Sequence, residues 1–150
     1  MGEPEQALAE KTYRAVGRFM FEFSQIEYAI RHYLAEEIGL NEEYFVAVVE
    51  SYEVGILCAV AIEVFTKSRT KESASRIKHQ INHFRRLDED RKRVAHGLWM
   101  PSKEGESVHY VSRSSSKPTL STNQAEALEQ LADETRALRS ELEKAFMACS

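Results

Sequence analysis

Apolar side chains recur every three or four residues over long stretches without proline, and this spacing constrains the fold more than any other feature of the sequence. In residues 9–38 the repeating positions are Val16, Phe19, Phe23, Ile26, Ile30 and Tyr33. In residues 122–146 they are Leu128, Leu131, Thr135, Leu138, Leu142 and Ala145. An α-helix turns once every 3.6 residues, so each set lies on one helix face that needs a partner surface. The chain is therefore expected to bury these faces against one another.

Two further helices are expected in the middle of the chain. Residues 42–66 repeat apolar side chains at helical spacing, but β-branched residues and Gly55 lower the helix propensity there. We therefore expect a bend near Gly55. A third helix begins at Ser73 or Ser75, because either side chain can accept a hydrogen bond from the first free amide groups. The apolar positions of this helix are Ile77, Ile81 and Phe84.

The remaining elements follow from capping and turn residues. Asp88 can cap a short fourth helix that reaches the Ala95-His96 pair. Residues 98–113 contain two short extended runs around a Lys-Glu-Gly turn, which predicts a small β-hairpin. The serine-rich residues 112–122 indicate a flexible link. The C-terminal helix is expected over about residues 122–147.

Together these elements predict an all-α fold: an up-and-down bundle of four to five helices, with the small hairpin inserted before the C-terminal helix. The chain has 150 residues, of which 43% are hydrophobic, and this is enough to bury one sizeable core. Residues 1–150 are therefore expected to form a single domain.

Composition and charge restrict the function classes. The formal net charge of −4 gives no overall attraction to nucleic acid, so such binding would need a local basic cluster. One exists at Arg85, Arg86, Arg91, Lys92 and Arg93. The two cysteines form no CxxC motif, and no signal segment opens the chain, which indicates a cytoplasmic protein. The most apolar run, residues 54–65, is too short to span a bilayer, so no membrane segment is expected.

Two charged residues interrupt the apolar stripes. Glu27 lies at the flank of the first stripe, and Arg91 takes a core position in the series Leu87, Arg91, Val94, Leu98. Removing a bare charge from water is costly, so each should have a partner, and a partly buried ion pair between them is one solution. Such a pair could serve function, or could only fix how the helices pack.

His96 stands at the expected end of the fourth helix, where the helix dipole favours a protonated imidazole. It stands five positions after Arg91, which places the two about 140° apart around the helix and about 7.5 Å apart along it. A histidine at a helix end can cap carbonyl groups, or it can transfer protons beside a fixed cation in phosphodiester chemistry. His79 and His83 lack a third metal ligand at useful spacing, so we expect a solvated face there and neither metal nor cofactor.

The segment "RKRVAHGLW", with "FEFSQIEYAIRHYL" upstream, resembles the HEPN family (higher eukaryotes and prokaryotes nucleotide-binding domains), whose mark is an arginine, four to six residues and a histidine. Here these are Arg91, four residues and His96. The resemblance covers roughly the first 100 residues. It implies a helical homodimer whose arginines and histidines meet in a cleft at the interface, and a metal-independent endoribonuclease activity.

The resemblance also implies a role for each matching residue. His96 would transfer a proton at the ribose 2′-hydroxyl or at the leaving oxygen, and Arg91 would hold the scissile phosphate. Glu27 would be the acidic group of the first helix that orients them. Arg85, Arg86 and Arg93 are the expected RNA contacts. Partners implied by the family are RNA and an antitoxin or regulatory protein, in a toxin or phage-defence setting.

One position departs from the family pattern. Members commonly have a small polar residue, often asparagine, directly after the arginine, and this chain has Lys92. Asparagine donates and accepts hydrogen bonds, whereas lysine only donates and adds charge. Two hypotheses follow: an active ribonuclease in which Lys92 helps to bind RNA, or a non-catalytic dimeric module that binds RNA or a protein partner.

Overall fold

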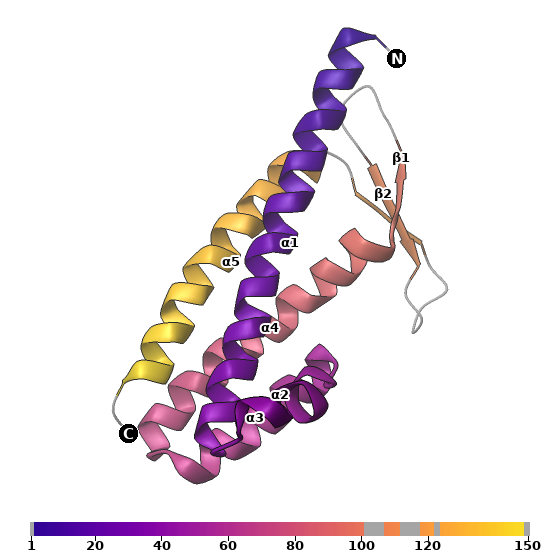
Figure 1. The fold of residues 1–150 in the computed structure, drawn as a ribbon. Helices are drawn as coiled ribbons and strands as arrows, with labels where there is room; N and C mark the ends of the chain where they lie inside the picture. The colour runs from indigo at the N-terminus through magenta and orange to yellow at the C-terminus, as the bar shows by residue number, and fades with distance from the viewer. Residues whose placement is uncertain (1, 101–106, 112–117, 122–123, 149–150) are drawn as a thin grey trace. The chain divides into compact units, whose positions relative to one another are not determined.

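Helices dominate the described part of the chain, which in this computed structural model comprises residues 2–100, 107–111, 118–121 and 124–148 (Figure 1). The helical elements are α1 (Glu3–Glu37), α2 (Glu42–Phe45), the π-helix η1 (Val46–Glu50), α3 (Val54–Ser68), α4 (Lys71–His96) and α5 (Gln124–Met147). The predicted helical fold class is confirmed. The predicted stripes also form the core, since Phe19, Phe23, Ile26 and Ile30 of α1 and Leu128, Thr135, Leu138 and Leu142 of α5 are buried.

Contacts divide the chain into two units. The first contains Met1–Phe23 and Glu89–Thr135, and the second contains Ser24–Asp88 and Arg136–Ser150. In the first unit α1 lies beside α5 (Figure 1), and Arg18 joins them. Its two terminal nitrogens donate to the carboxylates of Glu129 and Asp133, each at 2.5 Å. These pairs fix the alignment of the two helices, because a planar guanidinium can serve two carboxylates at once.

The second unit has an aromatic core that joins three helices. The Phe146 ring of α5 is stacked on Tyr33 of α1, with centroids 4.5 Å apart, and lies 5.0 Å from the Phe65 ring of α3. Phe65 and Phe146 are buried. Aromatic side chains bury the largest areas of any residues, so this cluster is a main source of packing energy in the unit.

Arg69 closes this unit at the connection between α3 and α4. Its guanidinium donates to both carboxylate oxygens of Glu37, at 3.2 and 3.0 Å, and to the carbonyl oxygens of Phe146 and Ala148, at 2.9 and 3.3 Å. It also lies 5.3 Å from the centroid of the Phe65 ring. The last carbonyl groups of a helix have no partner within the helix, so Arg69 satisfies the end of α5 while it holds the end of α1.

The two helices predicted on either side of Asp88 are one continuous helix, α4, of 26 residues. The prediction of a cap at Asp88 was wrong, because this residue lies inside the helix and is buried. The cap predicted at Ser73 or Ser75 was also wrong. Thr70 precedes the helix, and its hydroxyl accepts a hydrogen bond from the Ser73 amide at 3.3 Å. No glycine or proline occurs between Lys71 and His96, so nothing in this segment stops a helix.

The bend predicted near Gly55 lies earlier in the chain. The break falls at residues 51–53, between η1 and α3, and these segments are bent by 117°. Arg31 of α1 holds the break from inside the second unit, because it donates to the carbonyl oxygens of Val49 at 2.5 Å and Tyr52 at 2.8 Å. A buried arginine thus donates to two carbonyl groups at the break, and the Val49 oxygen also accepts a hydrogen bond from the Tyr52 amide at 3.3 Å.

A small β-hairpin was predicted over residues 98–113. The structure has three antiparallel strands before α5: β1 (Leu98–Met100), β2 (Ser107–Val111) and β3 (Pro118–Ser121), in the order β1-β2-β3. Trp99 pairs with Val108, and Tyr110 pairs with Thr119. The end of the predicted flexible link therefore supplies a third strand. Two strands alone are only marginally stable in water, which favours adding another.

Within the described residues, no single helix is long and apolar enough to cross a membrane. The segments Glu42–Glu50 and Val54–Ser68 reach that length and composition only when they are taken together across their bend.

Replacing Arg69 with alanine should lower the free energy of unfolding by about 3 kcal/mol, because it leaves the mostly buried Glu37 carboxylate and the end of α5 without donors. Urea denaturation measures this change. Arg76→Ala is the matched control, since Arg76 pairs with Glu72 at 3.0 Å on an exposed surface and should cost less than about 1 kcal/mol. Equal losses in the two variants would contradict the structural importance of Arg69.

The same pair should make stability depend on pH. The hydrogen bond from Arg69 holds the pKa of Glu37 below its ordinary range, although burial opposes this. The stabilisation is complete above the ordinary glutamate pKa of about 4.3 and declines as the pH falls towards the lower folded-state pKa. The difference in unfolding free energy between wild type and Arg69→Met should therefore shrink below about pH 4. In a Glu37→Gln background the same difference should not change with pH.

Candidate functional site

The last turns of α4 present the predicted site residues in the first unit. His96 is the final residue of the helix and is exposed. The Gly97 amide then donates to the Arg93 carbonyl oxygen at 2.8 Å, and β1 begins at Leu98. The chain therefore leaves the helix directly after the histidine, and the imidazole is open to solvent.

Trp99 secures this helix end from the sheet. Its indole N–H donates to the Val94 carbonyl oxygen at 3.0 Å. Val94 lies in the last turn of α4, where carbonyl groups lack helical partners. The hydrogen bond therefore links β1 to the turn that holds His96. Sequence reasoning missed it, although the five-residue spacing from Val94 to Trp99 around a glycine is visible in the sequence.

Arg91 lies over the ring of a buried phenylalanine. Its guanidinium carbon is 5.5 Å from the centroid of Phe23, which is only 2% exposed. An arginine over an aromatic face gains cation–π attraction, and its planar group keeps its N–H donors at the edge. Arg91 thus takes its predicted core position against the buried Phe23 ring. Arg91 itself is half-buried.

The neighbouring cations pair with carboxylates one turn earlier on α4. Lys92 lies 3.2 Å from Glu89, and Arg93 donates to Asp90. Burial raises the pKa of the Asp90 carboxyl above its ordinary range, and Arg93 partly offsets this effect. The end of α4 therefore carries the exposed imidazole of His96 and the guanidinium of Arg91 over the Phe23 ring. The two other cations, Lys92 and Arg93, pair with carboxylates.

Glu27, Arg85 and Arg86 lie in the second unit. The Glu27 carboxylate accepts a hydrogen bond from Arg31 at 2.6 Å, and Arg31 is buried with a side chain only 10% exposed. Arg31 is thus the partner that the sequence required for Glu27, and it was overlooked although it stands one helical turn away. Arg85 and Arg86 are exposed on α4.

Burial raises the pKa of the nearby Cys58 thiol to about 12, which leaves it unreactive.

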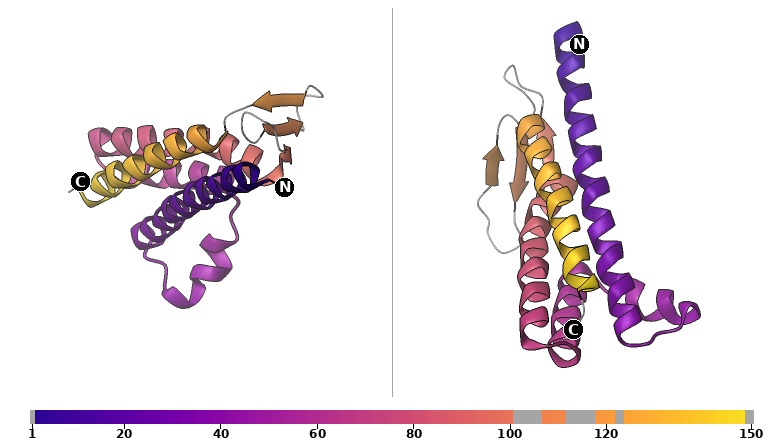
Figure 2. Two further views of the ribbon diagram at one scale, coloured as in Figure 1. Left: turned by 90° about the horizontal axis from the view of Figure 1, so that it is seen from above. Right: turned by 90° about the vertical axis from the view of Figure 1, so that its left-hand side faces the viewer.

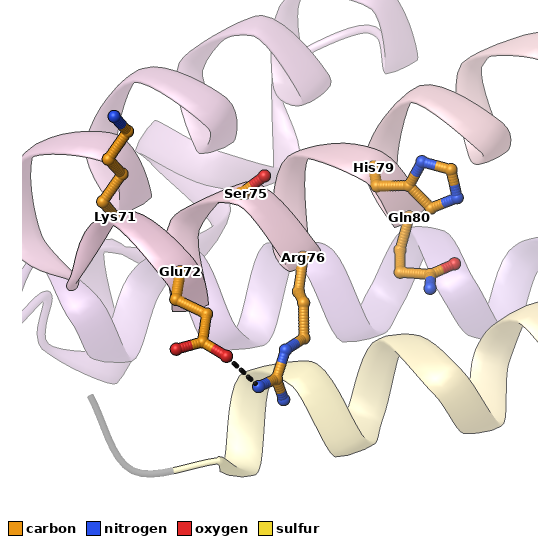
Figure 3. A pocket seen from close by; sticks show the side chains of 6 residues that line it. All are labelled: Lys71, Glu72, Ser75, Arg76, His79 and Gln80. Atoms are coloured by element: carbon orange, nitrogen blue, oxygen red, sulfur yellow. Dashed lines mark hydrogen bonds and ion pairs between the residues drawn. The ribbon is translucent and has the colours of Figure 1, made fainter.

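An open groove of about 650 Å³ lies further back along α4 in the second unit (Figure 3). Its lining residues are Lys71, Glu72, Ser75, Arg76, His79 and Gln80. Glu72 and Arg76 pair across one turn, as the dashed line in Figure 3 shows. None of the predicted catalytic residues lines this groove. His79 is exposed there, as expected for a solvated face.

The end of α4 thus presents an exposed imidazole, on His96, and a guanidinium, on Arg91, which are side chains of the kinds that bind phosphate groups in proteins. Among the described residues, no group of three or more histidine, cysteine or carboxylate side chains is arranged to hold a metal ion.

Comparison with known proteins gives no further assignment: no protein-family model matches the sequence, and no curated protein or solved structure is significantly similar to it.

Replacing Trp99 with phenylalanine should keep the packing of the ring but remove the hydrogen bond to Val94. We expect a loss of about 1 kcal/mol in the free energy of unfolding, together with faster hydrogen exchange at the Gly97 amide, because the end of α4 frays more easily. Tyr13→Phe is the control, since Tyr13 is 69% exposed. Unchanged exchange at Gly97 would show that Trp99 does not secure this turn.

Proposed function

We propose that this chain is a metal-independent endoribonuclease of the HEPN type, which acts as a homodimer. The observation that carries the proposal is the end of α4, where an exposed His96 follows Arg91, whose guanidinium lies over the buried Phe23 ring. Fixing the arginine on a core ring supports a preorganised cation, and preorganised charge is what stabilises a phosphoryl transition state. An RNA-cutting toxin or a phage-defence effector in the cytoplasm is the setting in which such an enzyme would act.

The proposed reaction uses the RNA as its own nucleophile. The ribose 2′-oxygen attacks the adjacent phosphorus and loses its proton, while the bond from phosphorus to the 5′-oxygen breaks and that oxygen gains a proton. The products are a 2′,3′-cyclic phosphate and a free 5′-hydroxyl. His96 carries out one of the two proton transfers, and Arg91 binds the phosphate oxygens as negative charge grows.

A second subunit would complete the site. Two proton transfers need two groups, and helix geometry separates Arg91 from His96 by about 140° around α4. A two-fold dimer that brings two α4 ends together would supply a second histidine and a second arginine to one phosphate. Arg85, Arg86 and Arg93 would then add contacts to the RNA backbone, as lysine and arginine side chains do in most nucleic-acid complexes.

Lys92 supports a second candidate, a non-catalytic dimeric module that binds RNA or a protein partner, such as an antitoxin. Its ammonium lies 3.2 Å from Glu89, in the position where the family commonly has a small polar residue. A lysine ammonium only donates hydrogen bonds, whereas an asparagine side chain can also accept one from a neighbouring group. In this candidate the site has kept its charge and lost its catalytic geometry.

The deciding experiment is cleavage of a mixed single-stranded RNA by the purified protein in EDTA, with analysis of the product ends. We expect cyclic-phosphate ends, and a cleavage rate at least about 100-fold lower for His96→Ala, because a positioned proton-transfer group contributes about that much. His79→Ala is the matched control, since both histidines are exposed on α4, and it should cleave like the wild type.

The alternatives give different results. Cleavage that survives His96→Ala would rule out the proposed mechanism. RNA that is bound but not cut would support the non-catalytic module. Cleavage gained only in Lys92→Asn would show a HEPN-type site that Lys92 has switched off.

A further inference from the structure

Basic side chains form a stripe along one face of α4 in the second unit. Figure 2 shows α4 as one continuous helix, so the direction of each side chain follows from a turn of about 100° per residue. Lys71, Lys78, Arg85 and Arg86 point within about 100° of one another and span about 22 Å along the helix axis. Three further polar side chains lie between or beside these cations. We call the whole set the basic stripe: Lys71, Ser75, Lys78, His79, Asn82, Arg85 and Arg86.

The basic stripe faces away from the core of its unit. The buried side chains of Ile77, Ile81 and Phe84 are centred about 130° from the middle of the stripe around the helix. Every member of the stripe is exposed except Asn82, which is half-buried. The open groove described above is lined by three members, which project to one side of α4 in Figure 3: Lys71, Ser75 and His79.

The four cations of the stripe have no carboxylate within ion-pair distance in the part of the chain that the structure describes. Glu72 is the only acidic residue in positions 71–87, and it pairs with Arg76, which lies outside the stripe, at 3.0 Å. Other exposed carboxylates on α3, α4 and α5 pair with cations of their own: Glu63 with Lys67, Glu89 with Lys92, and Glu141 with Lys144. The stripe therefore presents positive charge to solvent, although the formal net charge of the chain is −4.

The side-chain types of the stripe select among anionic partners. None of its seven residues is aliphatic, and none is phenylalanine, tyrosine or tryptophan. Helices that bind membrane surfaces insert an apolar face, and protein interfaces are centred on aromatic or apolar anchors. Single-stranded RNA is commonly held by aromatic side chains that stack on its bases. Lysine, arginine, serine and asparagine are instead the residues that contact phosphate and sugar, and a duplex concentrates the phosphates of two strands along one axis.

We propose that the basic stripe binds the phosphate backbone of a double-stranded segment of RNA. The four cations neutralise phosphates, and Ser75 and Asn82 donate hydrogen bonds to phosphate or ribose oxygens. The choice of RNA as the polyanion rests on the proposed function, which it extends by naming folded RNA as the substrate class. Contacts to the backbone carry no base information, so the binding is independent of sequence. Because the whole chain is acidic, its affinity for RNA should depend on this local stripe.

The test uses a fluorescent 2′-O-methyl RNA duplex of about 20 base pairs, which has the A-form shape but lacks the 2′-hydroxyl needed for the proposed cleavage. Fluorescence anisotropy should show saturable binding to the full chain. Lys78→Gln and Arg86→Gln should each weaken binding about fivefold and reduce the slope of log K against log salt by about 1, because each removes one phosphate contact. Lys67→Gln is the matched control and should bind like the wild type, since Lys67 is an exposed lysine that pairs with Glu63 on α3.

Comparison probes decide the remaining outcomes. A duplex of different sequence should bind equally, and the single strand about tenfold more weakly, because its charge density is lower. Equal losses in Lys67→Gln and Lys78→Gln would overturn the proposal, since only net charge would then matter. So would tighter binding of the single strand, of a polyglutamate peptide or of anionic lipid vesicles.

Binding and cleavage fail separately in these experiments. Wild-type binding by Lys78→Gln and Arg86→Gln would overturn the basic stripe and leave the ribonuclease proposal standing, because both variants keep His96. Duplex binding that depends on the stripe in a protein that cuts no RNA would have the opposite meaning. Circular dichroism would verify that the variants remain folded, as expected for substitutions at exposed positions.

Discussion

One guanidinium group joins the ends of separate helices in the second unit. Arg69 holds Glu37 at the end of α1, the last carbonyls of α5 and the ring of Phe65 in α3. Long amphipathic helices can slide along their apolar stripes, because residues one turn apart offer nearly equivalent contacts. A charged group with fixed donor directions has one best position. Arg69 therefore sets the register in which the aromatic core around Phe146 closes.

The helices that could be predicted well are those whose pattern is local. The stripes of α1 and α5 appear in the sequence at their true spacing, and the same residues form the core. The prediction of a helix start was wrong at a residue type that occurs both at helix caps and inside helices. Asp88 is a good capping residue, but here it lies buried within α4. A polar residue inside a helix is accepted when the surrounding fold supplies its partners, and this depends on tertiary structure that one sequence does not display.

The candidate site divides in the same way. The position of His96 at a helix end follows from the glycine after it, which is local information. The ring of Phe23 beneath Arg91 and the indole of Trp99 on Val94 join residues whose meeting depends on how the elements pack. Glu27 was correctly recognised as a carboxylate that needs a partner. Its partner Arg31, one helical turn further along α1, was not predicted, because a carboxylate and an arginine four residues apart also occur together on exposed helix faces.

The hydrogen bond from Trp99 has an evolutionary consequence. The β1–β2–β3 sheet can exchange most of its residues and keep its backbone ladder, because that ladder needs no particular side chain. Position 99 is different, since tryptophan alone combines a large apolar surface with a ring N–H that donates and never accepts. Tryptophan should therefore be retained at position 99 as the rest of the sheet changes in sequence, as long as the Val94 carbonyl oxygen depends on the indole N–H for its hydrogen bond. A lineage that discards the indole is expected to replace Gly97 or the turn around it as well, so that another group meets the same carbonyl.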